Sequence, residues 1–239
     1  MKFLLVIIGC VLPLGGFELP EASKQCIVGV SAGWDSSHVT LTCYERKGNS
    51  WTPVHGPWPG RLGKSGSVWG LGLHPNPAGS KLKVEGDGRA PAGVFRIGGA
   101  WGYDGAIRKH PKLFYRKITS RDLWVEDSKS PSYNRHLVLD HEPATAWEKK
   151  QQMRQGDHAH SLKLFVGHNA PPRVKPGGGS AIFFHIWRGG GSKPTAGCTT
   201  LSEDRLRTMI AWIDPDKQPL YVLLPKDEYG RHRSLWRLP

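Results

Sequence analysis

The residues best suited to chemistry are His185 and Cys198, which are joined by a glycine-rich loop. An apolar run, 181–184, precedes the histidine, so a buried strand can hold the imidazole while the loop returns a thiol beside it. A thiol becomes a strong nucleophile when a neighbouring base removes its proton. A single cysteine or a single histidine is usually an ordinary residue of the packed core. As a pair, they predict acyl transfer through a covalent cysteine intermediate.

The residues around Cys198 suggest how a reaction intermediate would be stabilised. Gly197 allows a substrate backbone to approach closely, and residues 199–203 are typical of a helix start. The thiol would then lie near a helix N-terminus, where free N–H groups favour negative charge. We therefore expect the backbone N–H groups around Ala196, Gly197 and Cys198 to bind an oxyanion.

Short strands separated by turns dominate the expected fold. Thirty glycines and 19 prolines are spread along the chain, which indicates many turns. We expect strands at 26–31, 38–45, 94–97, 136–139, 162–166, 181–187 and 220–224. Residues 53–66 and 75–79 are expected to form loops. The sequence thus predicts a mostly β domain.

One clear helix is expected over residues 203–213. Its apolar side chains recur at helical spacing, and Ser202 is suited to cap its start. The charged segment 143–160 is consistent with a surface helix or a lid. A few short helices therefore accompany the strands.

Four segments of the chain match motifs of one enzyme family in the family's order. They are the His185-to-Cys198 segment with its Thr-x-Gly-Cys turn, KVEGDGRAPAGVF at 83–95, WVED at 124–127 with YN at 133–134, and VGHN at 166–169. Over residues 26–225 the chain resembles the YkuD-type L,D-transpeptidase family. Two departures stand out, because Ala196 replaces the usual histidine before Gly-Cys and Thr200 replaces an arginine or asparagine.

The resemblance implies a fold and a reaction. The fold would be an L,D-transpeptidase-like β-sandwich over residues 24–225. Cys198 would attack the amide between the L-centre and the terminal D-residue of a peptidoglycan stem peptide, with His185 as base. An amine of a second stem, or water, would resolve the thioester. A backbone carbonyl near Ile186 would orient the imidazole, and neither a cofactor nor a metal is implied.

Some conspicuous polar and aromatic residues are candidates for the wall of a substrate cleft, although packing and turn formation explain them equally well. They are Trp124, Tyr133, Asn134, Asn169, Trp187 and Thr195.

Other functions stay open at this point. An L,D-carboxypeptidase or a wall amidase would use the same site. A zinc wall peptidase would be built on His158 and His160, whose spacing suits metal ligands, and chelator or thiol-alkylator sensitivity would distinguish it. A non-catalytic cell-wall-binding module is a further alternative, which the presence of both Cys198 and His185 disfavours.

The N-terminus predicts export to the periplasm or cell envelope. Lys2 precedes an apolar run, 3–12, which is too short to span a bilayer but typical of a signal peptide. We assign residues 1–23 to this signal, with cleavage near Gly15-Gly16 or Ala22-Ser23. An oxidising compartment permits a disulfide between Cys26 and Cys43, the alternative being two reduced core residues.

The net charge of +13 favours an anionic partner. A wall polymer or a membrane surface would fit, with plain solubility as the alternative. No nucleic-acid motif accompanies the charge, so nucleic acid is not expected as a partner. The densest basic cluster lies within 226–239, which we expect to form a basic C-terminal tail.

Overall fold

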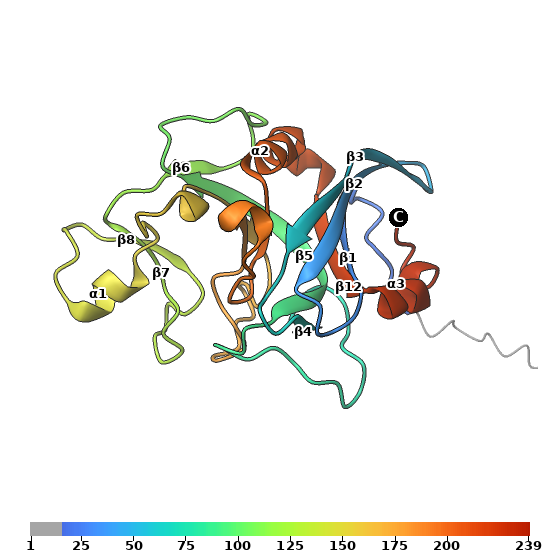
Figure 1. Cartoon of the computed structure of the whole chain (residues 1–239), viewed down its shortest axis with the longest axis horizontal. Coiled ribbons are helices and arrows are strands. Elements are labelled where there is room, and N and C mark those ends of the chain that lie inside the picture. The colour runs from blue at the N-terminus through green and yellow to red at the C-terminus, as the bar shows by residue number, and fades with distance from the viewer. Residues whose placement is uncertain (1–15) are drawn as a thin grey trace, which may run out of the picture.

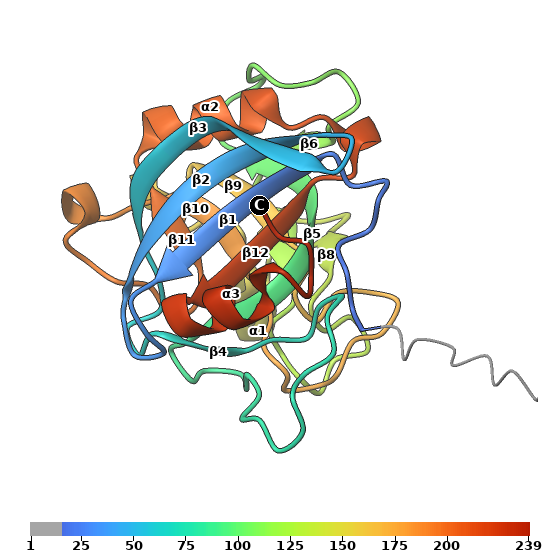
Figure 2. The same ribbon diagram turned by 90° about the vertical axis from the view of Figure 1, so that its right-hand side faces the viewer.

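Eight strands form a closed ring at the centre of the computed structural model, which describes residues 16–239 (Figure 1 and Figure 2). Their order around the ring is β12 (Leu220–Pro225), β1 (Gln25–Ser31), β2 (His38–Lys47), β3 (Ser50–Arg61), β11 (Thr199–Leu201), β10 (Phe183–Ile186), β9 (Leu162–Val166) and β5 (Ala90–Gly102). The long strand β5 pairs with β9 and also with β12, which closes the ring. The expected mostly β fold is confirmed, and the sheet closes on itself as a barrel.

Shorter elements surround the barrel. Strands β4 (Ser67–Trp69) and β6 (Tyr115–Lys117) pair with β5, and β7 (Asp122–Trp124) pairs with β8 (His136–Val138). The α-helices are α1 (Ala146–Gln151), α2 (Glu203–Trp212) and α3 (Lys226–Arg233). Figure 1 shows α1, β7 and β8 on the side of the barrel opposite α3. Within residues 16–239, no helix has both the length and the apolar character needed to cross a bilayer.

Apolar side chains from the strands fill the barrel interior. Leu41, Phe95, Leu164 and Phe184 belong to this core and are fully buried. Helix α2 adds Leu206, Met209 and Ile210 to the same core, so the helix expected over 203–213 is confirmed. Ser202 occupies its N-cap position, but its side chain makes no capping hydrogen bond.

The C-terminal segment is part of the folded domain. Helix α3 lies against β12 and β1 (Figure 2). Trp236 and Leu238 pack with Leu19 and Trp69 in a second apolar cluster. The backbone N–H of Leu19 also donates to Trp236 O at 2.9 Å. Residues 226–239, expected as a basic C-terminal tail, therefore pack onto the barrel.

The expectation of a loop over residues 53–66 was wrong, because residues 53–61 belong to strand β3. Prolines are tolerated in strands that expose an unpaired edge. β3 pairs along its length with β2, but with β11 only through Arg61 and Thr200. Its other edge is therefore largely free, which is why Pro53 and Pro59 fit there.

Of the two alternatives for Cys26 and Cys43, the structure shows two reduced core residues and not a disulfide. In the β1–β2 register, Cys26 lies opposite Tyr44 and Cys43 lies opposite Ile27. Neighbouring residues of a strand point to opposite faces, so one thiol joins the outer cluster and the other the barrel core. Both are free and buried. Burial raises the pKa of the Cys43 thiol to about 12, which makes it a poor nucleophile.

Candidate active site

Two parallel strands bring His185 and Cys198 to one cleft. Strand β10 pairs with β11 so that Phe184 lies opposite Thr199 and His185 opposite Thr200. Cys198, directly before β11, therefore lies beside Phe183, and residues two apart on a strand share a face. Cys198 and His185 both line a cleft of about 360 Å³. The expected helix start after Cys198 was wrong, because β11 intervenes and α2 begins only at Glu203.

His185 is held in one orientation. It is 3 % exposed, and its Nδ1 lies 2.9 Å from the backbone oxygen of Ile186. A carbonyl oxygen can only accept, so Nδ1 carries the hydrogen and Nε2 remains free to accept a proton. Burial, with a smaller contribution from the neighbouring His160, lowers the pKa of His185 to about 3. The imidazole is therefore neutral at pH 7, as a general base must be.

Cys198 is half-buried, and its Sγ donates to Ala181 O at 3.4 Å. Burial raises the pKa of the thiol above its ordinary value, although the Phe183 N–H and the Lys163 ammonium act in the opposite direction. Thiol and imidazole are thus both neutral at rest. Proton transfer from Sγ would have to accompany attack on a substrate rather than precede it.

Thr195 braces the turn that carries the thiol. Its Oγ1 donates to Cys198 O at 2.7 Å and accepts from the Gly197 N–H at 3.0 Å. The expectation that Gly197 supplies an oxyanion donor therefore fails in this geometry, because its N–H is already engaged. The N–H groups of Ala196 and Cys198 remain as candidates, and Ala196 is exposed in the cleft wall.

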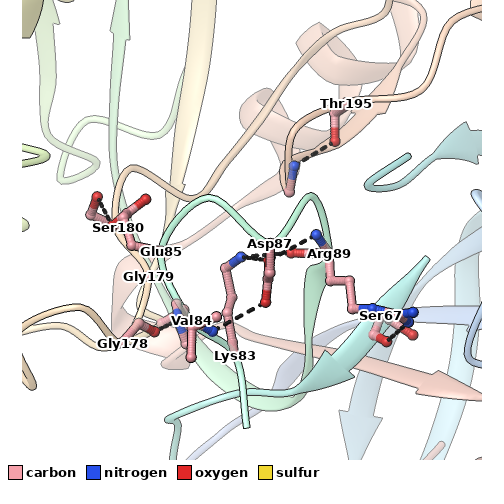
Figure 3. A network of polar contacts seen from close by, with 12 residues as sticks. Ser67, Lys83, Val84, Glu85, Asp87, Arg89, Gly178, Gly179, Ser180 and Thr195 are labelled. Atoms are coloured by element: carbon pink, nitrogen blue, oxygen red, sulfur yellow. Dashed lines mark hydrogen bonds and ion pairs between the residues drawn. The ribbon is translucent and has the colours of Figure 1, made fainter. Parts of the chain in front are cut away.

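The 83–89 loop supports the same turn from behind. Lys83 is buried, and its Nζ donates to Asp87 Oδ1 and Arg89 O, both at 2.7 Å. Figure 3 shows Asp87 between Lys83 and Arg89. A Cβ at Gly197, where φ is +155°, would lie 2.9 Å from Arg89 O. Only glycine fits at this position. The KVEGD segment thus supports the site, because Asp87 holds Lys83, Lys83 holds the Arg89 carbonyl, and that carbonyl lies against Gly197.

Only two of the six expected cleft-wall residues line the cleft, Trp124 and Thr195. Trp187 instead packs against the barrel core. The hydroxyl of Tyr133 donates to Glu85. Glu85 also accepts from Ser180 Oγ at 2.6 Å (Figure 3).

Asn134 and Asn169 are backbone braces rather than contacts for a ligand. Asn134 Oδ1 accepts from Trp124 Nε1 at 2.9 Å and from the Ala181 N–H at 3.0 Å. Asn169 Nδ2 donates to Lys175 O at 2.8 Å. Both asparagines have positive φ, 55° and 48°, a conformation that asparagine tolerates better than most residues. The Asn134 amide thus holds two residues of the cleft wall, Trp124 and Ala181, whereas the Asn169 amide holds residues 175–179 outside it.

His158 and His160 point to different partners. His158 Nε2 lies 3.0 Å from Glu203 Oε2, whereas His160 Nδ1 lies 2.7 Å from Asp157 Oδ1. His160 also lines the cleft. Across residues 16–239, no three or more His, Cys, Asp or Glu side chains are grouped as a metal site. The two imidazoles of the H-x-H pair are thus each engaged with a different carboxylate.

A residue that the sequence pattern did not reveal, Lys163, lies directly opposite His185 in the β9–β10 ladder. It is 4 % exposed, lines the cleft and donates from Nζ to Met153 O at 2.9 Å. Burial lowers its pKa to about 8, so it remains mostly protonated at pH 7. A single lysine within an apolar strand does not reveal from the sequence that its side chain lies beside His185 in the cleft.

The Cys198 thiol lies directly before β11, and the buried, neutral His185 imidazole lies on the neighbouring parallel strand, β10, of the β-barrel. Together they define a cysteine–histidine site. The chain belongs to the YkuD family, since the family model for the L,D-transpeptidase catalytic domain matches residues 36–222. No curated protein matches the chain.

The crystal structure of the helical cell shape determining protein Pgp2 from Campylobacter jejuni is similar to 85% of this chain at 12% sequence identity, with a TM-score of 0.39. The chain spans 48% of that protein, about half its length.

Proposed function

We propose that this protein is an exported L,D-transpeptidase that forms a thioester with peptidoglycan stem peptides at Cys198. Membership of the family indicates a peptidoglycan transpeptidase-type enzyme in general. The observation that supports the specific mechanism is the hydrogen bond from His185 Nδ1 to Ile186 O at 2.9 Å. It leaves Nε2 as the proton acceptor in the cleft that holds Cys198.

The first half-reaction acylates the enzyme. The Cys198 proton passes to His185 Nε2 as the sulfur attacks the amide carbonyl before the terminal D-residue. The carbonyl oxygen becomes an oxyanion near the N–H groups of Ala196 and Cys198. The C–N bond then breaks, and the imidazolium returns the proton to the leaving amine.

The second half-reaction releases the acyl group. An acceptor amine gives its proton to His185 and attacks the thioester, and the Cys198 thiolate leaves and is reprotonated. Water in place of the amine gives hydrolysis. The exposed Ala196 supports carboxypeptidase activity as a second candidate, because a small side chain beside the thiol leaves room for water.

Intact-protein mass spectrometry with a stem tetrapeptide tests this proposal. We expect a mass gain equal to the acyl tripeptide in the wild type and none in Cys198→Ala. His185→Gln should slow acylation by roughly 10²–10⁴-fold, the range for loss of a general base. Cys26 and Cys43 serve as internal controls, because both are buried thiols. An adduct that persists in Cys198→Ala would overturn the mechanism.

Export is part of the proposal, and its signal lies mostly in residues 1–15, outside the described residues. Leu19 is 2 % exposed and hydrogen-bonds to Trp236, so it belongs to the folded domain. Of the two expected cleavage points, Gly15-Gly16 therefore fits the fold better than Ala22-Ser23. N-terminal sequencing of cell-envelope protein should give a start before Leu19. Intact Met1 in a cytoplasmic fraction would contradict export.

The positive charge supports attraction to an anionic wall or membrane surface. The net charge is +13, and attraction between exposed charges weakens as salt shortens their range. Retention of the protein on purified cell walls should therefore fall between about 0.05 and 0.5 M salt. Retention that is insensitive to salt would argue for contacts other than charge.

A further inference from the structure

Lys163 is the one cleft-lining cation for which we find no carboxylate partner among residues 16–239. Lys83 forms an ion pair with Asp87 at 2.7 Å, and Arg188 forms one with Asp157 at 2.7 Å. Among the described residues, Lys163 makes a hydrogen bond to the Met153 carbonyl but no ion pair with a carboxylate. The carboxylates of Glu126, on the same cleft, and of Asp157 act on it only from a longer distance. An ammonium has three donors, and the Met153 carbonyl uses one. A buried ammonium with unused donors and no ion pair is energetically costly unless a ligand accepts the remaining hydrogen bonds.

The position of Lys163 relative to the base identifies which part of a substrate it would meet. Lys163 and His185 are opposite residues of an antiparallel pair, so their side chains leave the sheet on one face with Cβ atoms about 5 Å apart. In the proposed mechanism, His185 returns a proton to the leaving amine. The leaving residue must therefore lie on the His185 side of Cys198, which is also the Lys163 side.

We propose that Lys163 binds the free carboxylate of the substrate's terminal residue, the one that leaves when Cys198 is acylated. This rests on the proposed function and assigns a residue of this chain to recognition of its substrate. A stem peptide whose terminal carboxyl group is amidated lacks the anion and is therefore a poor donor. A peptide extended beyond the leaving residue carries its carboxylate one residue too far from Lys163.

Two synthetic stem tetrapeptides that differ only in a terminal free acid or primary amide test the proposal. Wild-type enzyme should acylate the acid with a kcat/KM roughly 10–100-fold higher than the amide, as expected for a hydrogen bond to a charged group. Lys163→Met should remove this preference by lowering kcat/KM for the acid alone. Lys81→Met, which changes an exposed lysine outside the cleft, should retain the preference.

The outcomes separate binding of the substrate from other roles of the lysine. An equal loss for acid and amide, together with slower alkylation of Cys198 by iodoacetamide, would show that Lys163 acts on the thiol, and would overturn the proposal. Equal wild-type rates for the two peptides would overturn it without any variant, so poor folding of Lys163→Met cannot hide a failure.

A binding measurement separates this proposal from the mechanism itself. Calorimetry in the Cys198→Ala background should show tighter binding of the acid than of the amide, and Lys163→Met should abolish the difference. If the wild type forms no acyl-enzyme with either peptide, the proposed function fails while this comparison still decides the role of Lys163. Equal affinities for acid and amide would refute the carboxylate site.

Discussion

The imidazole of His160 stacks on that of His185, with ring centroids 4.7 Å apart and planes inclined by 26°. Asp157 fixes His160 through its Oδ1, 2.7 Å from Nδ1, and binds Arg188 Nη2 through its Oδ2, also at 2.7 Å. The candidate base is thus held at Nδ1 by a backbone carbonyl and on one ring face by a second histidine. Reactive groups in an enzyme must be held close to the productive geometry.

Removal of the stacking ring should therefore impair catalysis more than folding. We expect His160→Ala to lower kcat for acylation by roughly 10–100-fold, since small misplacements of a catalytic group have effects of this size. His160→Phe should recover part of the loss, because it keeps a ring against His185. His158→Ala is the matched control, as His158 is exposed. Full activity in His160→Ala would show that Ile186 alone positions the base.

Thr195 offers a test of the turn. Thr195→Val removes the acceptor of the Gly197 N–H and the donor to Cys198 O, so buried backbone groups lose their partners. We expect a loss of about 1–3 kcal/mol in the free energy of unfolding and a lower acylation rate. Thr195→Ser keeps the hydroxyl and should stay near wild type. Urea unfolding and acyl-enzyme kinetics measure both effects, and equal behaviour of the two variants would contradict the role of the hydroxyl.

Ala196 should influence the fate of the thioester. An imidazole at this exposed position would fill space beside Cys198, so Ala196→His should raise the ratio of transfer to hydrolysis. Mass spectrometry of the products from one donor and one acceptor gives this ratio directly. An unchanged ratio in an active variant would show that residue 196 does not control water access.

Buried neutral histidines should make the fold sensitive to acid. Burial lowers the pKa of His74 to about 4 and those of His168 and His185 to about 3, whereas an unfolded histidine titrates near 6.5. Between these values the unfolded state binds more protons, so stability falls as pH drops below about 6.5. The slope should reach about 4 kcal/mol per pH unit for the three together.

Urea unfolding between pH 4 and 8 measures this slope. His74→Asn should make it shallower by about one proton, since a side-chain amide can still accept from the Val94 N–H but does not titrate. His38→Asn, which changes an exposed histidine, should leave it unchanged. Constant stability from pH 7 to 5 would contradict the argument.

Sequence patterns identified the elements whose signals are local. The strand expected at 162–166 was confirmed as β9 with the same bounds, and the helix at 203–213 was confirmed to within one residue. The expectation for 53–66 failed because proline tolerance depends on whether a strand has a free edge. That property belongs to the sheet order rather than to the segment.

Within the site, sequence indicated the residue types but not their surroundings. Motif order brought His185 and Cys198 to attention, and the structure places both on one cleft. The asparagine motifs drew attention to Asn134 and Asn169 equally, although these side chains hold backbone. Lys163 gave no signal, because its role depends on the β9–β10 register. Which side chains share a face across strands is set by pairing between distant segments.

Strand β12 lies between β1 and β5 and completes the ring. A chain that stops before Leu220 would contain every residue of the candidate site and yet present two unpaired strand edges and an open apolar interior. Such edges recruit other strands, so the truncated product should aggregate instead of remaining a weak enzyme. Because the polypeptide is made from its N-terminus, the barrel can close only after synthesis of β12, which begins 22 residues beyond the candidate nucleophile Cys198.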